Sequence, residues 1–279
     1  MADSPVFHPF DAALQLLPTA NDPHGFDGHT SAAYWNMVGP YGGISAATLV
    51  QAVMQHPQRL GEPLVLTVNY AAGTAAGAYR IHAEPVRSTR STQHWVLRLT
   101  QPDADAQDQV VLTATAMTAL RRDTWQQSDA PLPQVPAPQA VPRSNLQNAM
   151  EWLSRYDLRY HSGSVPSVWD GSLHPSLSQL WMRDEPVRPL DYPALAAMSD
   201  VFYPRIWRRR TTRVPAGTVS MTIYFHASAR QLTETGTGYL LGQAQAQAFR
   251  HGFFDQTAQV WNEAGTLLAT SHQLVYFKE

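Results

Sequence analysis

The chain of 279 residues carries the same order of helical and strand patterns twice. An almost wholly apolar segment, residues 42–54, precedes four segments in which polar and apolar residues alternate, and a second apolar segment, residues 193–202, precedes four more. Such alternation is typical of strands with one buried face. The predicted strands are residues 64–70, 78–86, 92–101, 109–120, 218–227, 238–249, 254–262 and 267–277. This repetition predicts one supersecondary unit that is duplicated and fused.

Both apolar segments predict buried helices. Ala, Leu, Ile, Val or Met occupy nearly every face of each segment, which indicates burial all round and not an amphipathic surface position. Asp191 can cap the second helix, Pro193 fits its first turn, and Pro204 limits it. A curved antiparallel sheet around each helix would bury it. The sequence therefore predicts an α+β fold of two units, each with a long central helix wrapped by a curved antiparallel β-sheet.

A proline-rich segment separates the two passages. Residues 131–142 read PLPQVPAPQAVP, and five prolines cannot sustain a helix or a central strand. We therefore predict an N-terminal unit over residues 1–122, an extended linker over 123–144 and a C-terminal unit over 145–279. The second unit would begin with a short helix near residues 150–153 and leading strands at 158–161 and 180–183.

Composition narrows the class of partner. The chain has 20 Lys and Arg against 22 Asp and Glu, so no global field attracts nucleic acid or an anionic membrane, and a small molecule is the expected partner. Zero cysteines exclude disulfides, thiolate metal sites and a cysteine nucleophile. The start of the chain does not resemble a secretory signal, and no apolar run approaches the roughly 18 residues of a membrane span. We expect a cytoplasmic protein.

Five places in the sequence resemble one family. Gly42 and Gly43 open the first helix, Ser199 and Asp200 lie in the second, and Thr218 precedes Phe225 by seven residues. The others are Gln273, which follows an apolar strand, and a strand pair that bears Arg87, Arg90 and Trp95. In order and spacing the chain resembles the acyl-CoA thioesterase II (TesB-like) family, whose fold is the double hotdog. It departs from that family in strand 64–70, which lacks the usual Ser-x-His.

The resemblance implies a reaction and roles for individual residues. Asp200 would be the general base for a water that Thr218 and Gln273 orient, and the backbone N–H groups of Gly43 and Ile44 would stabilise the oxyanion. Coenzyme A would enter as part of the acyl-CoA substrate, without a metal or redox cofactor. From the residues themselves, Asp200 has apolar neighbours, so its ionised form needs donors such as Thr218 and Gln273.

Five arginines follow the second helix and leave two alternatives open. They are Arg205, Arg208, Arg209, Arg210 and Arg213. They form either a solvated cluster or, through Arg208, Arg209 and Arg210, a contact with the phosphates of coenzyme A. The chain has eleven histidines but no His-Glu-x-x-His motif, so no metal site is expected.

Two functions from different classes fit this sequence. The first is an acyl-CoA thioesterase that releases the free acid and coenzyme A. The alternative is a non-catalytic hotdog protein that binds acyl-thioesters or acts as an interaction module. A hydratase on the same fold would have an Asp-x-Asn-x-x-His helix motif, which this sequence lacks. Because hotdog sheets commonly pair through exposed edges or faces, we expect a homo-oligomer.

Overall fold

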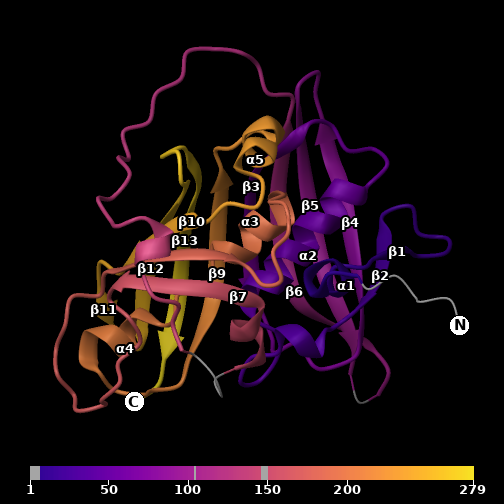
Figure 1. The fold of residues 1–279 in the computed structure, drawn as a ribbon. Coiled ribbons are helices and arrows are strands. Elements are labelled where there is room, and N and C mark those ends of the chain that lie inside the picture. The colour runs from indigo at the N-terminus through magenta and orange to yellow at the C-terminus, as the bar shows by residue number, and fades with distance from the viewer. Residues whose placement is uncertain (1–6, 104, 146–149) are drawn as a thin grey trace, which may run out of the picture.

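The computed structural model describes residues 7–103, 105–145 and 150–279 (Figure 1). Its strands form one 13-stranded sheet, in which all neighbouring strands are antiparallel. The first half contains α1 (Pro9–Ala13), β1 (Leu17–Pro18), β2 (Gly25–His29), η1 (Ala32–Tyr34), α2 (Gly42–Gln55), β3 (Glu62–Tyr70), β4 (Ala78–Ser88), β5 (Thr92–Pro102) and β6 (Asp108–Ala119). The second half contains η3 (Glu151–Arg155), β7 (Tyr156–Ser162), β8 (Ser178–Asp184), α3 (Tyr192–Met198), α4 (Arg205–Arg210), β9 (Ala216–Phe225), α5 (Ala229–Thr235), β10 (Leu240–Gln245), β11 (Phe249–Arg250), β12 (Phe253–Asn262) and β13 (Leu267–Phe277).

The two predicted repeats are present and share one sheet. The strand order is β1-β2-β4-β5-β6-β3-β9-β13-β12-β10-β8-β7, and the short β11 pairs with β12 outside this order. Strands of the first half therefore lie on one side of the β3–β9 contact and strands of the second half on the other. The helices α2 and α3 lie beside each other within the curve of this sheet (Figure 1). One cluster of buried apolar residues extends through both halves.

Each predicted strand is found, and one of them is broken. The predicted strand 238–249 divides into β10 and β11. At the break, Asp255 Oδ1 accepts hydrogen bonds from the backbone N–H groups of Gln247 (3.0 Å) and Ala248 (2.9 Å). A side-chain carboxylate thus replaces the ladder partner there, and the chain bends.

The second central helix is shorter than the predicted segment 193–202. The helix α3 begins after Asp191, whose Oδ1 accepts from Ala194 N at 2.8 Å, and it ends at Met198. Beyond it the N–H of Asp200 donates to Ala197 O, an i to i−3 bond that tightens the last turn. Placing Asp200 inside the helix was therefore wrong, because it lies in the turn that follows α3.

The proline-rich linker is extended, with a single 3-10 turn at η2 (Pro138–Ala140). It lies over the outer side of the second half, where Trp181 Nε1 donates to Pro136 O (2.8 Å) and Trp261 Nε1 to Ala130 O (3.1 Å). The short helix expected near 150–153 is the 3-10 helix η3. Residues 146–149, within the predicted second unit, lie outside the described residues, and the exact unit boundaries stay a prediction.

Across the described residues, no helix has both the length and the apolar character needed to span a membrane.

The seam between the halves is held at one end by Arg121. Its Nη2 donates to Pro63 O (3.0 Å) on β3 and to Phe225 O (2.8 Å) on β9, and its Nε donates to Glu62 Oε2 (2.9 Å). Glu62 Oε2 also accepts from the hydroxyl of Tyr192 at the start of α3 (2.8 Å). Arg121 and Glu62 thus connect both strands of the seam, β3 and β9, to the start of α3.

We expect Arg121→Ala to lower the free energy of unfolding by about 1 to 3 kcal/mol, because partly buried carbonyl and carboxylate acceptors lose a charged donor. Urea unfolding measures this change. Arg122→Ala, which truncates the exposed neighbouring arginine, is the matched control and should leave stability within about 0.5 kcal/mol. Equal effects of the two substitutions would contradict the assignment.

Candidate active site

Three polar side chains predicted from the sequence meet in a row, of which Asp200 and Gln273 are buried and Thr218 is partly buried. Gln273 Nε2 donates to Asp200 Oδ1 at 2.7 Å, and Thr218 Oγ1 donates to Gln273 Oε1 at 3.2 Å. The exposed fractions of Asp200 and Gln273 are 8% and 4%. Gln273 lies between the other two, and its amide links Thr218 to Asp200 through these two hydrogen bonds. The row orients an amide N–H toward the carboxylate.

The position of Thr218 depends on a β-bulge. Gln273 pairs with Met221 and Leu274 with Ser220, but Val275 pairs with Thr218, so Val219 is the extra residue. Strict alternation would place Thr218 on the outer face with Tyr224, which is 50% exposed. The bulge shifts Thr218 to the inner face that carries Gln273, which is a common use of bulges near sites.

The turn that carries Asp200 is anchored on both sides. Ser199 Oγ donates to Leu195 O at 2.8 Å, and Ser271 Oγ on β13 donates to Ser199 O at 3.1 Å. Both serines are buried. The carboxylate is therefore held against β13 by its backbone as well as by Gln273.

Asp200 also contacts the N-terminal end of α2, which belongs to the other half. Its carboxylate accepts a hydrogen bond from the backbone N–H of Gly43. A Cβ atom on Gly42 would lie 2.8 Å from Asp200 Oδ2, so the glycine leaves room for the carboxylate in its present position. The N–H of Ile44 donates instead to Tyr41 O (3.1 Å) within the first turn. Gly43 is thus brought to the carboxylate, whereas the N–H of Ile44 is engaged in the helix.

Two tyrosines that sequence reasoning missed fix this helix end. Tyr41 OH donates to Ala197 O of α3 (2.5 Å), and Tyr70 OH donates to Gly42 O (2.9 Å). The Tyr41 ring also stacks on Trp152, with ring centroids 4.1 Å apart. The only signal in the sequence was the place of Tyr41 next to the glycine pair.

Burial dominates the electrostatics of the site. It raises the pKa of Asp200 to about 7, while the hydrogen bonds from Gln273 and Gly43 act in the opposite direction. Burial, and after it the nearby Asp200 charge, raises the pKa of Tyr41 and that of Tyr70 well above the ordinary value. Near neutral pH the carboxyl group can therefore both release and accept a proton, whereas the two tyrosines stay neutral.

The predicted arginines lie elsewhere on the second half. Arg209 and Arg210 line a groove beside α4. Burial raises the pKa of Tyr203 and lowers that of Arg205, and the charge of the nearby Arg208 has a smaller, lowering effect on both. In the part of the chain that the structure describes, no group of three or more His, Asp or Glu side chains is arranged to hold a metal ion.

Comparisons with known proteins identify the family. Residues 31–119 match the model of the acyl-CoA thioesterase N-terminal domain, and residues 127–277 match that of the acyl-CoA thioesterase C-terminal domain. The chain belongs to the acyl-CoA thioesterase family. It is a thioester hydrolase with the double-hotdog fold expected from the sequence. No curated protein matches this thioesterase.

Solved structures agree with the fold. A conserved protein of unknown function with a hot dog fold from Alicyclobacillus acidocaldarius is 45% identical, with a TM-score of 0.91 over 98% of this thioesterase and 99% of that chain. The tesB protein of Mycobacterium avium subs paratuberculosis is 16% identical, with a TM-score of 0.76 over 97% and 98% of the two chains. The acyl-CoA thioesterase II TesB2 of Mycobacterium marinum is 16% identical, with a TM-score of 0.73 over 96% and 98%.

The adjacent glycines should respond differently to an added methyl group. In Gly42→Ala the new Cβ meets a carboxylate oxygen that can swing away, so we expect the protein to fold and turnover to fall roughly tenfold to 100-fold. In Gly43→Ala the Cβ lies 2.6 Å from the backbone oxygen of Ala197, so we expect unfolding at a lower temperature. Melting curves and acyl-CoA turnover on both variants check this. Identical responses of the two variants would contradict it.

Proposed function

We propose that this thioesterase hydrolyses an acyl-CoA to the free acid and coenzyme A, with Asp200 as the general base. The observation that supports this role most strongly is a buried carboxylate that accepts from Gln273 at 2.7 Å and faces a glycine pair at a helix N-terminus. A structural carboxylate of this kind is normally paired with a cation, whereas the donors to this one are an amide side chain and a backbone N–H.

In the proposed reaction, ionised Asp200 takes a proton from water as the water oxygen attacks the thioester carbonyl carbon. The tetrahedral intermediate then collapses, the carbon–sulfur bond breaks and the thiolate of coenzyme A leaves. Asp200 returns the proton to the sulfur, which restores the base. The step uses only water, substrate and protein groups. Such general-base assistance is worth about 10² to 10⁴ in rate.

Gln273 and Thr218 are proposed to position the base and the water. The Gln273 amide has a second N–H group besides the one bound to Asp200, and that N–H can hold the attacking water or the substrate oxygen. Thr218 fixes the orientation of this amide through Oε1. If the amide were rotated, its partially negative oxygen would face the carboxylate, and the oxygens of the two groups would repel each other.

The helix end at Gly43 and Ile44 is proposed to stabilise the oxyanion. The N–H of Gly43 donates to Asp200 in the resting protein, and that of Ile44 donates to Tyr41. When Asp200 takes up the proton it becomes a weaker acceptor, while negative charge develops on the substrate oxygen. The Gly43 N–H can then donate to the oxyanion, and the positive end of the α2 dipole stabilises the same negative charge. A homo-oligomer and a cytoplasmic location stay predictions.

We expect Asp200→Asn to lower kcat for acyl-CoA hydrolysis by roughly 10² to 10⁴, because the amide cannot accept the proton. The variant should melt at the same or a higher temperature at pH 8, since it removes a buried charge. Spectroscopic detection of the released thiol, together with a melting curve, measures both effects. Asp108→Asn, at an exposed carboxylate on β6, is the matched control. Wild-type turnover in Asp200→Asn would remove this residue from the mechanism.

The raised pKa of Asp200 predicts the pH dependence. Only the ionised form is a base, so kcat/KM should rise with pH to a plateau above about pH 7. The folded-state pKa exceeds the ordinary value of 3.8, so the folded protein binds more protons between about pH 4 and 7. The contribution of this group to stability is therefore present below pH 4 and is lost as pH rises through 7. Asp200→Asn should lack this loss. A kcat/KM that is flat from pH 5 to 8 would contradict the assignment.

A further inference from the structure

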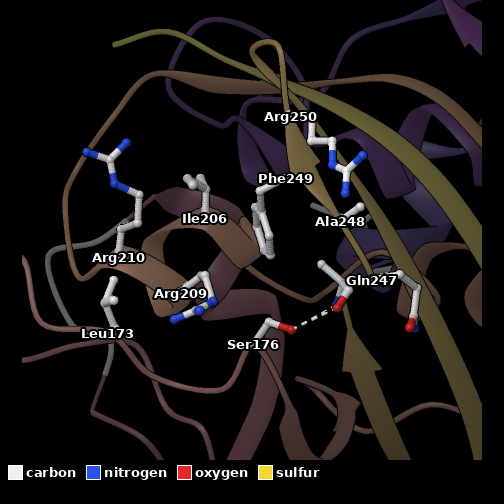
Figure 2. Close-up of a pocket in the computed structure, with 10 residues that line it drawn as sticks. Leu173, Ser176, Ile206, Arg209, Arg210, Gln247, Ala248, Phe249 and Arg250 are labelled. Carbon is white, nitrogen blue, oxygen red and sulfur yellow. Dashed lines mark hydrogen bonds between the residues drawn. The ribbon is translucent and has the colours of Figure 1, made fainter.

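A second candidate ligand site lies outside the Asp200 row. A groove of about 490 Å³ opens between α4 and the bend that joins β10 to β11. Figure 2 shows Arg209 and Arg210 on its helical side and Phe249 and Arg250 on its strand side. The rest of the apolar lining comes from Leu173, Ile206, Ala246 and Ala248. The groove therefore combines three guanidinium groups with an aromatic ring.

The charges in this groove are poorly compensated. None of the described residues that line it is acidic. Arg210 pairs with Glu279 at the exposed end of the chain, but the guanidinium groups of Arg209 and Arg250 have no carboxylate or hydrogen-bond partner among the described residues. Arginine suits phosphate because its planar fork donates two parallel hydrogen bonds. The groove thus favours a ligand with phosphate groups.

The aromatic ring adds a second requirement on the ligand. Phe249 is partly buried and packs on Phe254, with ring centroids 5.4 Å apart. In Figure 2 the ring lies between Ile206 and the bend, on the groove side. Aromatic side chains beside cationic ones hold nucleobases by stacking, which is worth roughly 1 to 3 kcal/mol per base. A phosphorylated nucleoside satisfies both parts of the lining.

One apolar cluster connects the groove to the two strands that carry Gln273 and Thr218. Val275 and Ala216 pack in the same apolar cluster as Ile206 and Phe249. Val275 follows Gln273 by two residues, and Ala216 precedes Thr218 by two, so each lies about 7 Å along its strand from the row.

The helix beside the groove is also fixed next to the row. Arg205 Nε of α4 donates to Gln256 Oε1 (3.1 Å), and Gln256 is the cross-strand partner of Gln273. The groove is therefore a neighbour of the proposed reaction centre.

We propose that this groove binds the phosphorylated adenosine end of coenzyme A, with Arg209 and Arg250 on the phosphates and Phe249 against the adenine. This inference rests on the proposed function, because acyl-CoA is the ligand that would connect the two places. The flexible pantetheine arm would run from the groove to Asp200 and deliver the thioester. Of the three arginines expected at the phosphates, Arg208 does not line this groove, and Arg250 takes a place there instead.

The first test measures nucleotide binding without turnover. Adenosine 3′,5′-bisphosphate should bind the full-length protein in titration calorimetry, and unphosphorylated adenosine should bind at least tenfold more weakly. Arg209→Ala and Arg250→Ala should each raise the Kd of the bisphosphate roughly tenfold to 100-fold. Arg230→Ala, which removes an exposed arginine of α5, a helix that lies apart from α4 in Figure 1, is the control and should not change it. Equal Kd values in all four proteins would overturn the proposal.

The second test separates this groove from the reaction. Arg209→Ala and Arg250→Ala should raise KM for an acyl-CoA at least tenfold with kcat unchanged. They should leave kcat/KM unchanged for the same acyl group on N-acetylcysteamine, which lacks the nucleotide. Equal losses with both substrates would overturn the groove assignment. If the wild-type protein hydrolyses no acyl-CoA, the proposed function fails, and the calorimetry still decides whether the groove binds the nucleotide.

Discussion

The contact between Asp200 and the glycine pair of α2 is the constraint on which the rest of the structure depends. The helix α2 has no capping side chain of its own, because its N-cap residue Tyr41 makes no side-chain hydrogen bond to the first turn. A carboxylate from the other half accepts from the Gly43 N–H instead. Negative charge at a helix N-terminus is favourable, and glycine at residues 42 and 43 lets the two chain segments meet. Fusing the halves therefore completes a helix end and a polar site in one contact.

The same burial that completes this contact prepares the carboxyl group for proton transfer. In water Asp200 would ionise well below neutral pH and would be a weak base. Desolvation between the two halves raises its pKa to about 7, and two hydrogen bonds keep the ionised form accessible. Burying the Asp200 charge lowers the stability of the fold, and the same burial gives the carboxyl group a pKa suited to a base near neutral pH. Reactive sites commonly combine lower stability with higher activity in this way.

Regular patterns made the fold predictable, and irregular ones hid parts of the site. Alternation located all eight of the predicted strands because one face of each is buried. The same rule would have placed Thr218 on the outer face, since it cannot anticipate the bulge at Val219. Asp200 was found by resemblance, but its apolar neighbours indicated a longer helix than α3, because a tightened last turn has no signature in composition. Tyr41 gains its role only from a contact distant in sequence, its hydrogen bond to Ala197 O.

The duplication does not give two equivalent sites, and the reason lies in three positions. Aligning the starts of the two helices places Tyr192 and Pro193 where the first half has Gly42 and Gly43, and Val50 where the second has Asp200. Val50 offers no proton acceptor. Pro193 has no N–H to donate, and its helix is already capped by Asp191. The second half thus supplies the carboxylate and the first supplies the open helix end, so each fused pair forms one such arrangement.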